Sequence, residues 1–289
     1  MIFIKWKRND KQVKDQKNEI FKTLEEEYEF ERRLANKLRN SSSNERAKLY
    51  RSVYDEFYSR ESLYAKLSGF GSPETISKAI HTQIEFLRRF LRKDLIFLEV
   101  GPGNYSFAAE VAQFVKLVYT ADVMSSKCDR VASLGTIQQI VFDGLIIPLK
   151  ENSIHLIYSH QVIEHLHLDD AYEHFKNIYR VLVQGGFYIC ITPNRINGPH
   201  DISKYFASMA SGLHLKEYTT SELFHAFRIA GFKKIKAYCG GKNTYISIPL
   251  FIIKFIEKFL DSLPHGLKKV AILSTPFRQL LGIRLVGTK

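Results

Sequence analysis

Three acidic side chains stand where a parallel sheet commonly binds a nucleotide-like ligand. Glu99 begins the segment Glu99-Val100-Gly101-Pro102-Gly103-Asn104-Tyr105, Asp122 ends Thr120-Ala121-Asp122, and Asp143 lies in Phe142-Asp143-Gly144. Glycines such as Gly101 and Gly103 let the backbone turn sharply and let a ligand approach it closely. A carboxylate about twenty residues further on can accept hydrogen bonds from both hydroxyls of a ribose. We therefore expect Asp122 to bind a ribose and Asp143 to accept a hydrogen bond from an adenine amino group.

The segments that must position these acids alternate between strand and helix. Short apolar runs predict strands at 95–100, 116–121, 137–141, 154–158, 186–191 and 233–238. Helical patterns lie between them, at about 106–114, 168–183 and 220–230. Strands that alternate with helices indicate an α/β fold with a parallel sheet covered on both faces. Ligands of such sheets bind beyond the carboxyl ends of the strands, where the three acids are expected.

The flanking regions predict further helices. Residues 8–40 are rich in Lys, Glu, Arg and Leu and lack Gly and Pro, and Ser41-Ser42-Ser43-Asn44 can cap a second helix that runs to about Ser59. Gly69-Phe70-Gly71-Ser72-Pro73 is a break, and a third helix is expected at about 74–93. We therefore expect an N-terminal helical extension at 1–73 and one domain at 74–289. Within that domain, helices at about 244–281 precede a last strand at 283–286.

Residues 94–239 resemble the class I S-adenosylmethionine (SAM)-dependent methyltransferases, and within them the group similar to ubiquinone/menaquinone-biosynthesis methyltransferases. The matching segments follow the family's order: 99–103, Asp122, 143–148, 153–159, 162–166, 180–186 and 192–194. The resemblance implies a Rossmann-like sheet of seven mostly parallel strands, the last of them antiparallel. On that template 233–238 and 283–286 are strands six and seven, and the helices at about 244–281 form an insertion.

The resemblance also implies that the cofactor is SAM. The residues expected to bind it are Glu99, Gly101, Gly103, Asp122, Asp143, Gly144 and Ser159. Two positions depart from the family's pattern, because Tyr105 stands where a third glycine is frequent and His155 where Asp is usual. A dinucleotide-binding oxidoreductase is the main rival, but its G-x-G-x-x-G fingerprint is incomplete here, where the sixth position is Ser106.

Four histidines follow the fourth and fifth predicted strands and are candidates for the chemical step. The methyl group of SAM is already activated, so alignment of the reactants accounts for much of the catalysis. A hydroxyl acceptor also needs a general base, and the imidazole pKa lies near neutrality. We expect His160 and His200 to be catalytic and His165 and His214 to contact the substrate. No metal is expected, because His165 and His167 would diverge on a helix.

The acceptor is less defined than the cofactor. Residues 198–204, followed by 214–218, resemble bacterial methyltransferases of cell-surface glycan or secondary-metabolite pathways. This resemblance favours O-methylation of a small-molecule, glycan or lipid-linked acceptor. Two alternatives stay open. An RNA methyltransferase would use the basic C-terminal region, where residues 231–289 carry 11 Lys and Arg against two acidic residues. A catalytically degenerate SAM-binding scaffold would use the N-terminal helices to bind a partner.

Composition places the chain among globular proteins, and we expect a cytoplasmic location. Hydrophobic residues make up 45% of the sequence, and the formal net charge is +12. The apolar segment 248–260 is interrupted by Pro249, Lys254, Glu257 and Lys258, so it is too short to span a bilayer. Phe251, Phe255 and Phe259 nevertheless share a helical face with lysines beside them. Such a helix can lie on anionic lipid or pack on its own sheet, and both readings stay open, as does the oligomeric state.

Overall fold

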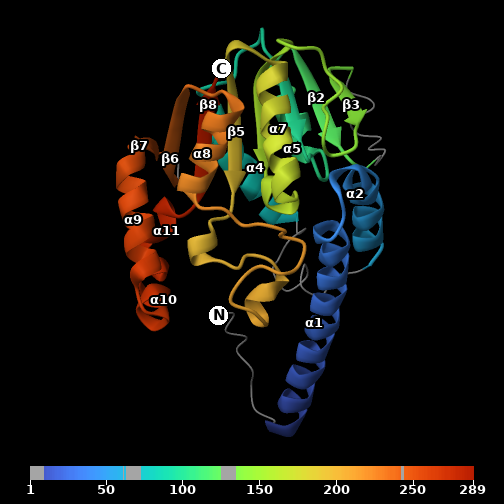
Figure 1. The fold of residues 1–289 in the computed structure, drawn as a ribbon, viewed down its shortest axis with the longest axis vertical. Coiled ribbons are helices and arrows are strands. Elements are labelled where there is room, and N and C mark those ends of the chain that lie inside the picture. Colours follow the sequence, from blue (N-terminus) through green and yellow to red (C-terminus); the bar gives the residue numbers. More distant parts are fainter. Residues whose placement is uncertain (1–9, 61, 63–72, 125–134, 242–243) are drawn as a thin grey trace.

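The computed structural model describes residues 10–60, 62, 73–124, 135–241 and 244–289 (Figure 1). The predicted break at 69–72 lies outside these residues. The centre of the molecule is an eight-stranded sheet with the order β3-β2-β1-β4-β5-β8-β6-β7. The strands are β1 (Ile96–Val100), β2 (Leu117–Asp122), β3 (Ile137–Val141), β4 (Ile154–His160), β5 (Leu182–Thr192), β6 (Lys234–Gly241), β7 (Thr244–Ile248) and β8 (Ile283–Thr288). The strand order reverses between β1 and β4, and this switch point is where open α/β sheets bind ligands.

The predicted α/β fold is confirmed, including the antiparallel last strand. Strands β1 to β5 pair in parallel, and β8 lies antiparallel between β5 and β6. The expected count of seven strands is wrong by one, because β7 pairs antiparallel with β6 at the edge of the sheet. Residues 244–248 are therefore a strand and not the start of a helical insertion. Gly240 makes this hairpin possible: its φ is +125°, and an added Cβ would collide with the carbonyl oxygen of Thr244.

Helices cover both faces of the sheet (Figure 1). Residues of α4 (Pro73–Leu87) and α5 (Ser106–Val111) share one core cluster with Leu156 and Tyr158 of β4. Residues of α7 (Leu168–Val181) and α8 (Thr220–Ala230) share a second cluster with Ile157, the strand residue between them. Alternate side chains of a strand point to opposite faces, so β4 contributes to both cores and is fully buried over most of its length.

The N-terminal helices lie beyond the carboxyl ends of the strands (Figure 1). These are α1 (Asp10–Arg39) and α2 (Ser43–Tyr58), and side chains of both belong to the same core cluster as the sheet. Arg46 of α2 forms a fully buried pair with Asp170 of α7, with Nε–Oδ2 at 2.5 Å and Nη2–Oδ1 at 2.8 Å. The second helix is thereby fixed against the edge of the sheet where the site is expected. The division of the chain at residue 73 stays a prediction.

Three helices follow β7: α9 (Leu250–Ser262), α10 (His265–Leu273) and α11 (Thr275–Leu280). Buried Glu257 of α9 joins them to the rest of the molecule. Its carboxylate accepts hydrogen bonds from the backbone N–H of Thr220 at 2.7 Å and of Ser221 at 3.2 Å, at the start of α8. A negative charge at a helix N-terminus is stabilising. Among the described residues, none of the helices has the length and apolarity needed to cross a membrane.

Candidate functional site

The turn after β1 adopts the backbone conformation that its glycines permit. Gly101 and Gly103 have φ angles of +68° and +55°. An added Cβ on Gly101 would lie 2.6 Å from Cγ2 of Val162, whereas nothing lies within 4 Å of the corresponding point on Gly103. The first glycine is therefore required by its backbone and by Val162. The second leaves open space beside the backbone, where a ligand can approach.

Tyr105 occupies the position where the family often has glycine. Its φ is +60°, a left-handed conformation that costs a non-glycine residue roughly 1–2 kcal/mol. The Tyr105 side chain is nevertheless buried in the core cluster that includes Phe97 and Phe107. Burial of an aromatic ring offsets a cost of that size. The turn thus accommodates the side chain, as this departure requires.

Two acidic side chains approach one another at the ends of β1 and β2. Glu99 is 5% exposed, and its Oε2 has no hydrogen-bond partner in the described part of the chain. Burial raises the Glu99 pKa to about 8, with a further contribution from the charge of Asp122. Burial also raises the pKa of Asp122, against hydrogen bonds from the N–H groups of Met124 and Val123 that lower it. These carboxyl groups would be stabilised by a ligand that brings hydrogen-bond donors or positive charge.

Asp143 and Ser159 are held differently from these two acids. Asp143 is exposed, and its Oδ1 accepts hydrogen bonds from the N–H groups of Leu145 and Ile146 at 2.8 and 2.9 Å. The next residue, Gly144, has a φ of +85° and lies against the ring of Tyr50. Asp143 therefore shapes its own turn, and its contact to adenine stays a prediction. The hydroxyl of Ser159 is 2.8 Å from that of Tyr188 inside the core, so the structure does not bring it to the acids.

The second helix adds two tyrosines that sequence reasoning missed. Tyr54 and Tyr58 lie one turn apart on α2. Burial, followed by nearby charges that include Asp122, raises the pKa of the Tyr54 phenol. Tyr58 is 64% exposed, and partial desolvation together with the charge of Asp122 raises the pKa of its phenol. The Tyr54 hydroxyl is buried without a hydrogen-bond partner among the described residues. The spacing of four between Tyr50, Tyr54 and Tyr58 was a usable signal, because it places all three on one helical face.

The residues at this edge fit SAM. The buried, unpartnered Oε2 of Glu99 and the open space at Gly103 are the two observations that carry the fit. SAM would offer the acids ribose hydroxyls and a positive charge, which favour ionised carboxylates. Glu99, Asp122 and the glycine turn would hold the cofactor, with Asp143, Tyr54 and Tyr58 around it.

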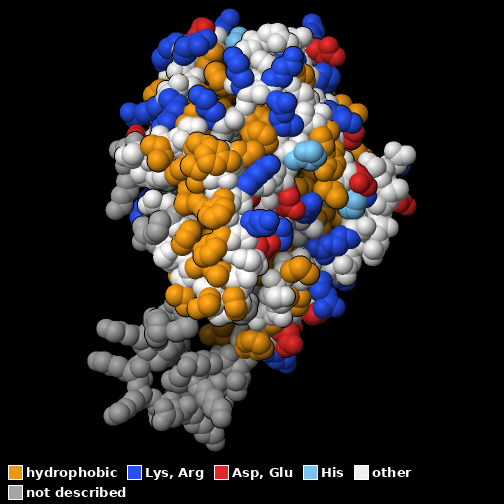
Figure 2. Space-filling view, turned by 60° about the vertical axis from the view of Figure 1, so that its left-hand side comes forward, with side chains coloured by type: hydrophobic (Ala, Val, Ile, Leu, Met, Phe, Trp, Pro, Cys, Tyr) orange, Lys and Arg blue, Asp and Glu red, His pale blue; other side chains and the backbone are white. Residues whose placement is uncertain are grey.

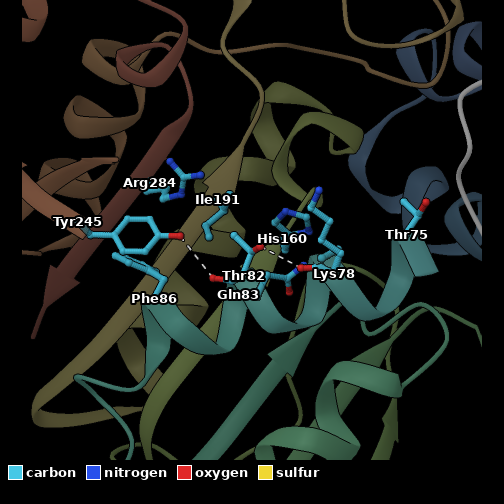
Figure 3. A pocket seen from close by; sticks show the side chains of 10 residues that line it. Thr75, Lys78, Thr82, Gln83, Phe86, His160, Ile191, Tyr245 and Arg284 are labelled. Carbon is cyan, nitrogen blue, oxygen red and sulfur yellow. Dashed lines mark hydrogen bonds between the residues drawn. The ribbon is translucent and has the colours of Figure 1, made fainter. Parts of the chain in front are cut away.

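A cavity of about 330 Å³ lies one strand away, at the ends of β4 and β5. Figure 3 shows His160 and Arg284 beside it, with α4 running beneath them. The lining residues are Thr75, Lys78, Ala79, Thr82, Gln83, Phe86, His160, Ile191, Tyr245 and Arg284. Burial, together with the charge of Arg284, lowers the pKa of His160 to about 4. His160 is therefore neutral at pH 7 and able to accept a hydrogen bond or a proton.

The other three predicted histidines lie in a different network. The backbone N–H of His200 and the ring Nδ1 of His214 each contact Oε1 of Glu217, at 2.7 and 2.8 Å. Burial disfavours the charged form of His214, but Glu217 and neighbouring carboxylates raise its pKa overall. His165 stands edge-on to His214, and burial and the His214 charge lower its pKa to about 3. The structure thus groups these histidines around a loop and leaves His160 alone in the cavity.

Glu164, His165 and His214 offer metal-ligand atoms within 4.8 Å of one another. A carboxylate with two imidazoles is a donor set that a transition metal can accept. The Nδ1 atoms of both histidines already have partners, the carbonyl of Leu213 and the carboxylate of Glu217. Glu164 Oε2 accepts a hydrogen bond from Thr192 at 2.9 Å, whereas its buried Oε1 has no partner among the described residues. Hydrogen bonds to neighbours therefore occupy only part of the donor set, and the absence of a metal stays a prediction.

Comparisons with known proteins agree with this geometry. Residues 98–190 match the family model described as a methyltransferase domain, whereas no curated protein matches the chain. A chain from the complex between the Haloferax volcanii Trm112 methyltransferase activator and a methyltransferase has a TM-score of 0.51 at 15% identity. The similarity covers 72% of this chain and 88% of that one. Haemonchus contortus phosphoethanolamine N-methyltransferase 1, in complex with phosphoethanolamine and S-adenosylhomocysteine, has a TM-score of 0.58 at 11% identity, covering 86% of this chain and 50% of that one.

At these identities the structural similarity shows a shared fold, and the family model shows that residues 98–190 are similar to a methyltransferase domain. That segment begins in β1 and includes the glycine turn, Asp122, Asp143 and His160. The chain therefore has the Rossmann-like fold of the class I SAM-dependent methyltransferases, and residues 98–190 within it match the methyltransferase family model.

Proposed function

We propose that the chain is a SAM-dependent methyltransferase that methylates an oxygen of a small-molecule, glycan or lipid-linked acceptor held beside His160. One observation carries the proposal. Glu99, whose Oε2 has no partner among the described residues, and the open turn at Gly103 stand at the end of β1, and the cavity stands at the end of β4, its neighbour in the sheet. Val100 pairs with Ser159 in that register, so the turn at Gly101 and His160 directly follow paired residues.

The two halves of the site have separate tasks. Glu99 and Asp122 bind the cofactor, and Tyr54 and Tyr58 of α2 cover it. When bound, SAM supplies a methyl group that its sulfonium has already activated. His160 accepts the proton of the acceptor hydroxyl, which a neutral imidazole can do.

The cavity favours an acceptor that carries an anionic group. Its volume of about 330 Å³ is at the lower end of the roughly 300–1,000 Å³ typical of small-molecule sites. Arg284 and Lys78 provide positive charge, and a guanidinium can bind a phosphate or carboxylate through two hydrogen bonds. An anion beside Arg284 would also offset the charge that, together with burial, lowers the pKa of His160. We propose that His200 and His214 position the neighbouring loop through Glu217.

Methyl transfer from labelled SAM tests this proposal. Hydroxyl acceptors with and without a phosphate or carboxylate should be compared, with amines and RNA included. His160→Gln should lower kcat by about 10²–10⁴ if it removes a general base. Arg284→Gln should raise KM for anionic acceptors and leave KM for neutral ones unchanged. The exposed residues His225 and Arg228 supply matched controls as His225→Gln and Arg228→Gln.

Three outcomes would contradict the proposal. One is turnover by His160→Gln at the wild-type rate. Another is methylation of RNA with a steep dependence on salt, which indicates phosphate contacts and favours the nucleic-acid alternative. The third is the absence of cofactor binding, which would exclude any SAM-dependent methyl transfer by this chain.

A further inference from the structure

Helix α9 is apolar on two opposite faces, and only one of them is covered. Ile253 and Leu260 are buried against the body of the protein. Phe251 and Phe255 are 73% and 72% exposed, and Phe259 is also exposed. The three phenylalanines are spaced by four residues, so they form one stripe along the outer face of the helix.

The next helix continues this apolar surface. Leu267, Val270 and Leu273 of α10 are each more than 60% exposed and are spaced by three residues. Figure 2 shows a stripe of hydrophobic side chains on the side of the molecule where α9 and α10 lie, with Lys and Arg side chains beside it. Large apolar side chains gathered in this way mark an interaction surface.

The charges on this surface are positive. Lys254 and Lys258 are exposed and each directly precedes a phenylalanine of the stripe, and Lys269 is exposed on α10. The two acidic residues of α9 do not offset them. Glu257 points inward to the start of α8, and Asp261 is paired with Lys268 at 2.8 Å. The face therefore combines bulky apolar side chains with lysines that have open access to solvent.

We propose that the outer face of α9 and α10 docks on the surface of an anionic membrane. Phenylalanines enter the boundary between headgroups and acyl chains, while adjacent lysines bind anionic headgroups. The charge pattern favours lipid over a protein partner or a second copy, because Lys254 and Lys258 interleave with the phenylalanines of the stripe. A second copy would bring the same lysines face to face.

Docking through the outer face of α9 and α10 bears on which methyl acceptor the cavity could receive. Strand β7 ends at Ile248 and α9 begins at Leu250, and Tyr245 of β7 lines the cavity beside His160. The cavity is thus connected to the docking face by one short segment, which suits a lipid-linked acceptor with an anionic headgroup. This consequence rests on the proposed function, whereas membrane docking itself does not.

Flotation of the full-length protein with vesicles tests the docking. Vesicles of phosphatidylcholine alone are compared with vesicles that also contain phosphatidylglycerol, at low and high salt. The variants are Phe251→Ser/Phe255→Ser and Lys254→Glu/Lys258→Glu. Their matched controls change exposed residues elsewhere, as Met209→Ser/Ile229→Ser and Lys116→Glu/Lys150→Glu. Thermal unfolding with S-adenosylhomocysteine checks each variant for an intact cofactor site.

The expected result is binding to anionic vesicles at least about tenfold tighter than to neutral ones, because each lysine near an anionic surface contributes severalfold. Both α9 variants should lose at least about tenfold in binding, and both controls should bind as wild type. No flotation with anionic vesicles would overturn the proposal, and so would equal binding by the α9 variants. Self-association that depends on Phe255, without vesicle binding, would assign the face to a second copy. None of these results alters the cofactor measurement, so failure of the docking is distinguishable from failure of the proposed function.

Discussion

Replacing Glu99 with glutamine should make the ligand-free protein more stable and cofactor binding weaker. The Glu99 side chain is buried, and its pKa rises from the usual 4.5 to about 8. Between these two values the folded state holds a proton that the unfolded state has lost, so stability falls as the pH rises. Each pH unit above 4.5 lowers the free energy of unfolding by about 1.4 kcal/mol. At pH 7 the buried Glu99 therefore lowers the free energy of unfolding by about 3 kcal/mol.

Glutamine has the same shape and no such titration. The Glu99→Gln variant therefore avoids this cost at pH 7 and gains nothing near pH 4, where both states of the wild type are protonated. A new amide N–H without a partner costs about 1–3 kcal/mol, so we expect a net gain of about 1–2 kcal/mol at pH 7. Thermal unfolding at both pH values measures it, with exposed Glu151→Gln as the matched control.

The same substitution should weaken cofactor binding, although it stabilises the ligand-free protein. The ionised carboxylate that is unfavourable in the empty site is the form that binds the donors and positive charge of SAM. S-adenosylhomocysteine lacks the sulfonium charge but keeps the ribose hydroxyls and the ammonium group. It should therefore raise the Tm of wild type more than that of Glu99→Gln, with affinity at least about tenfold lower in the variant. A lower Tm for ligand-free Glu99→Gln at pH 7, or an unchanged ligand shift, would refute the reasoning.

Three further predictions concern the packing and the chemistry. Asp170→Asn leaves Arg46 buried without its partner and should lower the free energy of unfolding by about 3 kcal/mol in urea, with an unchanged m-value; a loss below about 1 kcal/mol would contradict a buried pair. Gly101→Ala should weaken S-adenosylhomocysteine binding and stability, and adding Val162→Ala should restore only part of the stability, because it removes the 2.6 Å contact but leaves the φ of +68°. At saturating cofactor, kcat/KM for the acceptor reports the enzyme before the acceptor binds, so it should be flat from about pH 6 to 8 and fall only toward pH 4, since the pKa of His160 is about 4; a fall of kcat/KM centred near pH 6.5 would exclude His160 as the base.

The sheet that carries the cofactor site was predictable because its signals are local. Strands β1, β2, β4 and β5 each contain a short apolar run, the glycine turn directly follows β1, and Asp122 is the last residue of β2. The edge strand β7 was missed because its five residues pair only with β6, a contact that local periodicity does not report. The position of Ser159 in the core could have been predicted from the sequence, because alternate strand residues share a face and Ile157, two residues earlier, is buried.

The acceptor side of the site was much less predictable. The position of His160 after a strand was visible in the sequence, but its cavity is built from α4, β5, β7 and β8 as well as β4. Arg284 lies more than a hundred residues from His160 in the chain, so only the sheet order brings them together. The same holds for Tyr54, which approaches Asp122 because α2 folds back over the strand ends.

Calorimetric titration of the protein with S-adenosylhomocysteine tests the central claim most directly. Wild type should bind, and ligand at 100 times its dissociation constant should stabilise the fold by about 2.7 kcal/mol. Asp122→Asn should weaken binding at least about tenfold, whereas exposed Asp55→Asn on α2 should bind as wild type. Absence of binding at millimolar ligand, or equal binding by Asp122→Asn, would contradict the assignment of this edge of the sheet as a SAM site.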